Sequence, residues 1–321
     1  MRRPLQTTSA QSPLHLEPQP PLHLEPQSPL RLEPQSPLRL EENTIYCGDA
    51  GVFLSQIPDA SVDLVICDGP YGVTTHAWDQ HTSIQEFNLR LIAWCSRILK
   101  EGGAMYLFGK HDCIDFIDYR PYLHLRTRIV WYQPSRLAQG RRNYTNNYDV
   151  ICYFLKGPQP RCFNLEAIRV PQLVELEHRK RCERVPSVQQ GPYAKTKYNE
   201  QGKNPGDVWG DIKQLTYRSK ELLSRDLLHT IQKPERLIER LVLASSNAGD
   251  LVLDPFAGVG TCPVVCKRLQ RRFLASEANP TFVALANQRL QEARESLDSI
   301  PSVPTPTQNP HNTLETDDDD V

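Results

Sequence analysis

Between about residues 42 and 299, short apolar runs alternate with stretches whose apolar residues recur at helical spacing. Runs such as residues 62–67 and 251–253 are typical of strands buried on both faces, whereas the pattern of residues 86–99 is typical of an amphipathic helix. This alternation predicts βαβ units. We therefore expect an α/β fold with a doubly wound, mainly parallel sheet.

The periodicity also predicts where the individual elements lie. The expected strands are residues 44–47, 62–67, 104–108, 128–132, 149–154, 251–253 and 272–275. The expected helices are residues 52–57, 86–99, 234–245, a segment after Gly260, and 280–292. From about residue 158 to 225 the periodicity is lost, which indicates an insertion into the α/β domain.

The two ends of the chain differ in composition from the middle. Residues 12–41 contain four copies of an eight-residue unit with two prolines each, close to Ser-Pro-Leu-His/Arg-Leu-Glu-Pro-Gln. Such a unit forbids continuous helix and is too short to pack as a structural repeat, so we expect residues 1–41 to be a disordered tail. Residues 299–321 are rich in proline and end in an aspartate run, which predicts a second, acidic disordered tail.

Charge is segregated along the chain although the net charge is only −1. Residues 125–225 hold 19 lysines and arginines against 9 acidic residues. A basic middle of this kind fits a phosphate-binding face. The residues that we expect to contact phosphates are Arg136, Arg141, Arg142, Arg179, Lys180 and Arg181.

Nine cysteines without a Cys-x-x-Cys pair argue against a disulfide framework and against a four-ligand zinc site, so we expect no metal. Cys262 and Cys266 are interpreted as small core residues, and so is Cys67. No apolar stretch approaches 18 residues, and the arginine-proline start lacks the apolar core of a signal peptide. We expect a soluble, cytoplasmic protein.

Two short motifs follow two of the expected strands directly. Asp68-Gly69-Pro70-Tyr71 follows the first, and Asp254-Pro255-Phe256-Ala257-Gly258-Val259-Gly260-Thr261 begins where the second ends. Because the carboxyl ends of parallel strands meet at one edge of a sheet, where open α/β sheets bind ligands, we expect the motifs to form a single site.

The glycine loop of the second motif lets the backbone approach a ligand at a helix N-terminus. A nicotinamide cofactor would favour a third glycine at the sixth position, where this chain has Pro263. Asp254 would repel a phosphate but suits an ammonium group. Glu277 follows the next strand and is well placed to accept hydrogen bonds from both hydroxyls of a ribose.

Together these motifs resemble those of DNA methyltransferases that modify exocyclic amino groups. The second motif resembles their DPFxGxGT loop for S-adenosylmethionine, and the first resembles their D/S/N-P-P-Y catalytic loop. Because the catalytic motif comes first, the resemblance is to the beta class. It implies a Rossmann-like, S-adenosylmethionine-dependent methyltransferase fold, with residues 42–157 as the catalytic half, 158–225 as the target-recognition insertion and 226–298 as the cofactor-binding half.

The resemblance also implies roles for individual residues. Asp68 and the carbonyl of Gly69 would accept the two N–H groups of the target amine, Pro70 would stiffen the turn, and Tyr71 would stack on a flipped base. For the cofactor, the resemblance places Asp49 against the adenine ring and residues 230–233 near the methionine tail, and it adds the glycine loop with its flanking carboxylates. The cofactor-binding residues implied are Asp49, Thr230, Gln232, Lys233, Asp254, Pro255, Phe256, Gly258, Gly260, Thr261 and Glu277.

Three positions depart from the family pattern, since Gly69 replaces a proline, Val259 a serine and Ile231 a threonine. We still expect an active enzyme that methylates double-stranded DNA, with N6 of adenine favoured over N4 of cytosine because the catalytic loop carries aspartate. Methylation of RNA or protein glutamine, and a catalytically inactive DNA-binding protein, are alternatives. Cytosine C5 chemistry would need an activated cysteine, usually after proline, and the chain has no Pro-Cys dipeptide. A partner endonuclease and a homodimer stay open.

Overall fold

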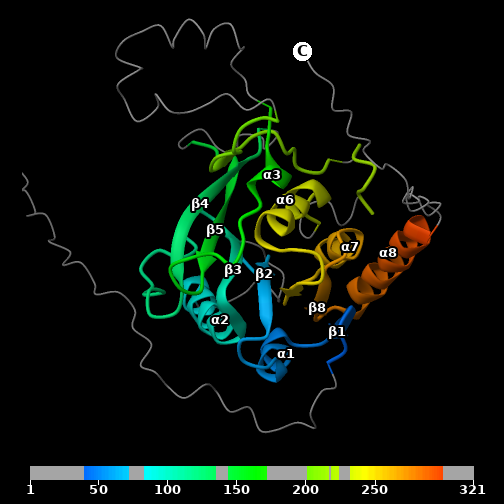
Figure 1. The fold of residues 1–321 in the computed structure, drawn as a ribbon, viewed down its shortest axis with the longest axis horizontal. Helices are drawn as coiled ribbons and strands as arrows, with labels where there is room; N and C mark the ends of the chain where they lie inside the picture. The colour runs from blue at the N-terminus through cyan, green and yellow to red at the C-terminus, as the bar shows by residue number, and fades with distance from the viewer. Residues whose placement is uncertain are drawn as a thin grey trace, which may run out of the picture.

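One mixed sheet with helices on both faces forms the body of the protein in a computed structural model (Figure 1). The structure describes residues 40–71, 83–134, 144–171, 201–216, 218–223 and 232–298. The strands within these ranges are β1 (Thr44–Cys47), β2 (Val62–Cys67), β3 (Leu99–Gly109), β4 (His124–Tyr132), β5 (Tyr148–Leu155), β6 (Val208–Trp209), β7 (Leu251–Asp254) and β8 (Arg272–Glu277). The helices are α1 (Ala50–Gln56), α2 (Ile84–Ile98), α3 (Leu165–Ile168), α6 (Glu235–Ser245), α7 (Thr261–Arg268) and α8 (Pro280–Asp298).

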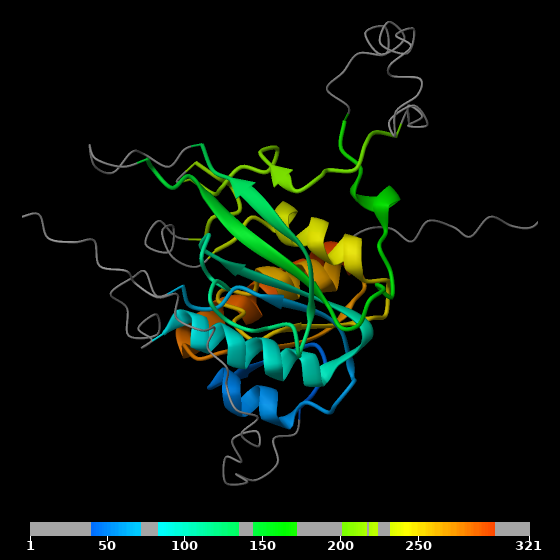
Figure 2. The same cartoon turned by 90° about the vertical axis from the view of Figure 1, so that its left-hand side faces the viewer.

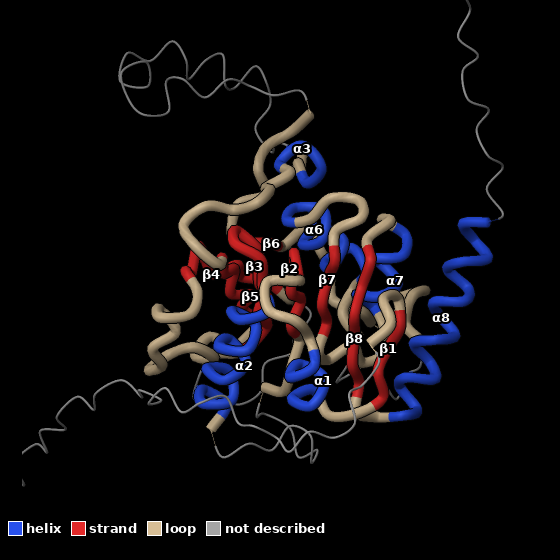
Figure 3. Tube along the Cα trace, turned by 60° about the horizontal axis from the view of Figure 1, so that its bottom comes forward, coloured by secondary structure: helices blue, strands red, loops and turns tan. Residues whose placement is uncertain are grey.

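The described strands lie in the order β1-β8-β7-β2-β3-β5-β4-β6 (Figure 3). Neighbours from β1 to β3 are parallel, whereas β5 runs antiparallel to both β3 and β4. From β2 the chain passes through α2 to β3, and from β7 it passes through α7 to β8 on the other side. The strand order therefore reverses between β2 and β7, which is where a doubly wound sheet binds its ligand. The predicted fold class is confirmed.

Hydrophobic clusters cover each face of the sheet. On one face, residues of α1 and α2 such as Phe53 and Ile92 pack on Val65 of β2. On the other, residues of α6 and α7 such as Leu241 pack on Leu64 of β2. Figure 2 shows α1 and α2 below the sheet and α6 above it. All six residues of β2 are buried, which explains why the strand is apolar at every position except Asp63.

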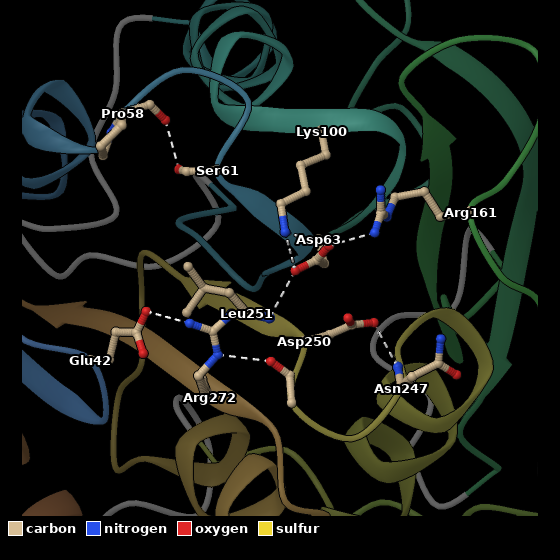
Figure 4. Close-up of polar contacts among 11 residues, drawn as sticks. Glu42, Pro58, Ser61, Asp63, Lys100, Arg161, Asn247, Asp250, Leu251 and Arg272 are labelled. Carbon is tan, nitrogen blue, oxygen red and sulfur yellow. Dashed lines mark hydrogen bonds and ion pairs between the residues drawn. The ribbon is translucent and has the colours of Figure 1, made fainter.

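One buried carboxylate interrupts that run at the amino end of β2. Asp63 is 3% exposed and accepts hydrogen bonds from the Nζ of Lys100 at 2.8 and 2.9 Å and from the backbone N–H of Leu251 at 3.0 Å. Arg161 forms an ion pair with it at 3.3 Å (Figure 4). This network joins β2, β3, β7 and the segment after β5 at the edge of the sheet opposite to the two motifs, and buried charge is paired there as expected.

All of the predicted strands and helices are present, and several extend beyond their predicted ranges, such as β3, which the sequence predicts at residues 104–108. The sequence did not predict α3 or β6, because four and two residues are too short for a periodic signal. At the amino end of the described residues, Leu40 packs against the core and Glu42 pairs with Arg272. Residues 1–39 and 299–321 lie outside the described residues. No helix among the described residues is long and apolar enough to cross a membrane.

Candidate active site

The two motifs lie side by side at one edge of the sheet. Strands β2 and β7 are adjacent and parallel, with Leu64 opposite Val252. Asp68 directly follows β2, and Asp254 is the last residue of β7. A Cβ atom on Gly69 would lie 3.1 Å from the ring of Phe256, so the first motif passes close to the second.

Asp68 is held by two side-chain partners. The hydroxyl of Tyr71 donates to Oδ1 at 2.7 Å, and Nζ of Lys233 donates to Oδ1 at 2.8 Å and to Oδ2 at 2.6 Å. The side chains of Lys233 and Asp68 are 16% and 18% exposed. The sequence predicts a cofactor role for Lys233, and in the structure its ammonium group contacts the carboxylate of Asp68.

Two ammonium groups lie near the ring of Tyr71, the last residue of the first motif. Nζ of Lys233 is 5.3 Å and Nζ of Lys110 is 5.5 Å from the centroid of its ring, within reach of cation–π attraction. Burial, followed by the charges of Asp68 and Asp149, raises the pKa of Tyr71 well above its usual value. The side chain therefore stays a neutral phenol that donates its proton to Asp68 in a hydrogen bond.

A buried polar cluster that the sequence did not predict supports Lys110. Asp149 accepts hydrogen bonds from Nζ of Lys110 at 2.9 Å and from Nε2 of Gln133 at 2.8 Å, and both Asp149 and Gln133 are 3% exposed. Lys110 and Gln133 follow β3 and β4, while Asp149 is near the start of β5. Because β5 runs antiparallel, its start lies at the same sheet edge, a direction that hydrophobic runs alone do not encode.

The glycine loop begins α7 with two residues in the left-handed region, Gly258 at φ 53° and Gly260 at φ 80°. A Cβ atom on Gly260 would lie 2.7 Å from Cβ of Ala286 in α8. Glycine is therefore required at this position by both its backbone and its surroundings. Arg289 of α8 donates to the carbonyl of Val259 at 2.8 Å and to Oγ1 of Thr261 at 3.3 Å, which fixes the loop from behind.

Glu277 lies at the end of β8 beside this loop. Its Oε2 accepts the N–H of Gly258 at 2.9 Å, and its Oε1 accepts the N–H of Asn279 at 2.8 Å. The backbone N–H of Gly48, which follows β1, donates to the carbonyl of Glu277 at 3.0 Å. Asp49, the next residue, caps α1 by accepting the N–H of Val52 at 3.0 Å. The structure thus brings Asp49 and Glu277 to neighbouring strand ends.

Asp254 is a buried carboxyl without a cationic partner among the described residues. It is 6% exposed and accepts the N–H of Phe256 at 3.1 Å. Burial, with smaller contributions from the charges of Asp68 and Glu277, raises its pKa to about 8. A ligand with an ammonium and a sulfonium group suits this concentration of carboxylates, so the residues present fit S-adenosylmethionine.

The other predicted residues have mixed locations. Gln232 is buried, donates to the carbonyl of Glu221 at 2.6 Å and accepts the N–H of Leu223 at 3.2 Å, so its side chain connects two segments. The carbonyl of Pro255 accepts a hydrogen bond from Ser276 at 2.7 Å. Thr230 and the six basic residues Arg136, Arg141, Arg142, Arg179, Lys180 and Arg181 lie outside the described residues.

The cysteines predicted to be core residues are buried. Cys67, Cys262 and Cys266 are at most 3% exposed. Burial raises the pKa of Cys67 well above its ordinary value, so the thiol beside Asp68 is no activated nucleophile. Of the described residues, no group of three or more His, Cys, Asp or Glu side chains could hold a metal ion.

Comparison with known proteins decides the family. A family profile for N6 and N4 methyltransferases, described as DNA methylase, matches residues 62–288. The chain belongs to this DNA methylase family. It is 34% identical to the DNA adenine methyltransferase YhdJ of Escherichia coli over 78% of this chain and 83% of that protein. It is 32% identical to the Type II methyltransferase M.HpaI of Haemophilus parainfluenzae over 81% of this chain and 77% of that protein.

Solved structures support the same fold. The DNA modification methylase TTHA0409 of Thermus thermophilus has a TM-score of 0.51 at 24% identity, covering 78% of this chain and 95% of that one. The cytosine-N4-specific PvuII methyltransferase has a TM-score of 0.54 at 15% identity, covering 81% and 92%. The match to the family confirms the predicted family, enzyme class, S-adenosylmethionine cofactor and DNA substrate. The roles of the individual site residues, the partner endonuclease and the homodimer stay predictions.

Proposed function

We propose that this DNA methyltransferase modifies N6 of adenine, with Asp68 and Gly69 holding the amino group. The observation that carries the proposal is the adjacency of β2 and β7, which brings Gly69 of the first motif against Phe256 of the second. The catalytic aspartate favours adenine, and the adenine specificity in the name of the YhdJ relative supports the same base. Methylation of N4 of cytosine is the alternative, because that base presents an amino group beside a ring nitrogen to the same acceptors.

The residues of the site can favour attack by a poor nucleophile. The lone pair of an exocyclic amine is delocalised into its ring, so the nitrogen must become pyramidal as it attacks. The carboxylate of Asp68 and the carbonyl of Gly69 accept its two N–H groups and so favour that geometry. S-adenosylmethionine, when bound, supplies a methyl group that its positively charged sulfur makes electrophilic.

Tyr71 supports the base once it has left the duplex. An adenine inside the helix cannot reach the end of β2, so the base must flip into the site. The ring of Tyr71 offers a stacking surface, and its hydroxyl bond to Asp68 fixes the orientation of that surface. One side chain thus connects base stacking to the carboxylate that holds the amine.

On the cofactor side, Asp254 and Glu277 supply the polar contacts. Asp254 in its ionised form would pair with the ammonium of the methionine moiety, and Glu277 would accept the ribose hydroxyls. The left-handed Gly258 and Gly260 keep side chains away from the path of the cofactor.

Single-molecule sequencing of DNA from cells that express the protein tests this proposal, with cells that express Asp68→Ala as the control. We expect N6-methyladenine at one recurring sequence, and none with the variant. N4-methylcytosine at a recurring sequence would refute the choice of base. Unmodified DNA, in cells where the folded wild-type protein is present, would refute the proposed activity.

A further inference from the structure

The ammonium group of Lys233 spans both oxygens of the catalytic carboxylate. The contacts of 2.8 Å to Oδ1 and 2.6 Å to Oδ2 connect two residues that are 165 positions apart in the chain. Both side chains are largely buried, at 16% and 18% exposure. A charge pair with two short contacts in such a place is geometrically well defined, unlike an exposed pair whose long side chains are free to separate.

An ionised carboxylate has about four acceptor sites, two on each oxygen. Within the described residues, the hydroxyl of Tyr71 and Nζ of Lys233 both bond to Oδ1, whereas Lys233 alone bonds to Oδ2. Oδ2 therefore retains an acceptor site that a target amine can use without displacing either partner. Lys233 and Tyr71 together determine the rotation of the carboxylate and hence the direction of that site.

The backbone on either side of Lys233 is itself anchored. Gln232 bonds to residues 221 and 223, and Pro234 precedes α6 as its N-cap. Glu235 pairs with Arg289 at 2.8 Å. Arg289 also bonds to the carbonyl of Val259 in the glycine loop, so one side chain of α8 connects that loop to the segment that carries Lys233.

We propose that Lys233 is a positioning residue for the methyl transfer, which holds Asp68 with Oδ2 directed at the target amine. The inference rests on the proposed function, because it assumes that Asp68 binds the amine. It differs from a role of Lys233 as a cofactor ligand, which the sequence alone predicts. The two roles differ in a measurable way: a positioning residue changes the rate of transfer, whereas a cofactor ligand changes cofactor affinity.

The chain offers a matched control for simple loss of a buried ion pair. Lys100 contacts both oxygens of Asp63 at 2.8 and 2.9 Å, with the same chemistry as Lys233 on Asp68 (Figure 4). This pair lies at the opposite edge of the sheet, away from both motifs. Lys100→Met therefore reports what the loss of such a pair does to folding alone.

The experiment compares wild type, Lys233→Met, Lys233→Arg and Lys100→Met. Calorimetry gives the dissociation constant for S-adenosylmethionine, and a single turnover at saturating cofactor and DNA gives the rate of methyl transfer. For Lys233→Met we expect cofactor affinity within about threefold of wild type and transfer slower by about 100-fold, the scale of a misplacement of about 1 Å. Lys233→Arg should recover part of the rate, because guanidinium also pairs with both carboxylate oxygens. Lys100→Met should lower the melting temperature and leave the transfer rate of the folded enzyme unchanged.

A double-mutant cycle with Asp68→Asn separates the pairwise effect from general damage. Because the neutral amide does not hold the ammonium group, adding Lys233→Met to Asp68→Asn should slow transfer by less than about threefold. Equal slowing in both backgrounds would overturn the proposal. So would a wild-type transfer rate in Lys233→Met, or a loss of cofactor affinity with a normal rate at saturation. A wild-type enzyme that transfers no methyl group to DNA would refute the proposed function instead.

Discussion

Asp254 should make cofactor binding depend on pH in a way that one substitution removes. Its pKa of about 8 means that the buried carboxyl is protonated in the free enzyme at neutral pH. Pairing with the ammonium of S-adenosylmethionine requires the ionised form. At pH 6.5 the enzyme must therefore lose a proton from Asp254 on binding, at a cost of about 2 kcal/mol, since each pH unit below the pKa costs about 1.4 kcal/mol.

Two quantities follow from this cost. Cofactor affinity should rise by about tenfold per pH unit between about pH 5.5 and 7, before the α-amino group of the ligand, with a pKa of about 7.7–8.0, loses much of its proton. About one proton should be released for each cofactor bound at pH 6.5. Calorimetric titrations in two buffers with different ionisation enthalpies measure that number directly.

Asp254→Asn is the control, because the amide keeps the shape of the side chain and cannot ionise. It should bind the cofactor more weakly at pH 7.5, with a flat pH dependence and no proton release from this site. Stability should respond in the opposite sense. Because the folded state raises this pKa, the protonated carboxyl favours folding at low pH, and wild type should lose stability relative to Asp254→Asn as the pH rises toward 8. Wild-type affinity that is constant from pH 5.5 to 7.5, with no proton released, would refute the assignment of Asp254 to the ammonium.

Three further predictions concern other parts of the site. Tyr71→Phe should slow methyl transfer by about tenfold because it loses the 2.7 Å hydrogen bond to Asp68, and Tyr71→Ala should also lose about 1–3 kcal/mol of stacking on the flipped base. Equal fluorescence of a 2-aminopurine target base on binding to Tyr71→Ala and to wild type would contradict this. Gly260 has a φ of 80°, and an added Cβ would lie 2.7 Å from Cβ of Ala286, whereas Gly249 has a φ of 82° and an added Cβ would meet nothing within 4 Å. Gly260→Ala should therefore unfold at a lower temperature than the control Gly249→Ala, and equal melting temperatures would contradict the crowding argument. Neutralising one of the six basic residues predicted to contact DNA should make the slope of log DNA affinity against log salt concentration shallower by about one unit. An unchanged slope in every variant would mean that these residues do not contact phosphates.

Most of the sheet could be predicted because its strands are buried on both faces. The run at β2 is apolar except for Asp63, and the neighbouring β7 is buried throughout, so both produce a clear signal in the sequence. The adjacency of their ends follows from the topology of parallel strands. The sequence alone therefore predicts that the two motifs lie at one edge of the sheet.

The contacts between side chains could not be predicted in the same way. Lys233 lies in a segment expected to bind the cofactor, and its bond joins it to Asp68, 165 positions away in the chain. The cluster of Lys110, Gln133 and Asp149 depends on the antiparallel direction of β5, which an apolar run does not specify. Such long-range pairings of single polar residues leave no periodic signal in one sequence.

The most direct test of the central claim is the chemical identity of the methylated product. Purified enzyme is incubated with duplex DNA and S-adenosylmethionine that carries a deuterated methyl group, and the nucleosides are then analysed by mass spectrometry. The account predicts labelled N6-methyldeoxyadenosine with wild type and none with Asp68→Ala, although that variant still binds the cofactor. Labelled 5-methyldeoxycytidine, or undiminished labelling by Asp68→Ala, would contradict it.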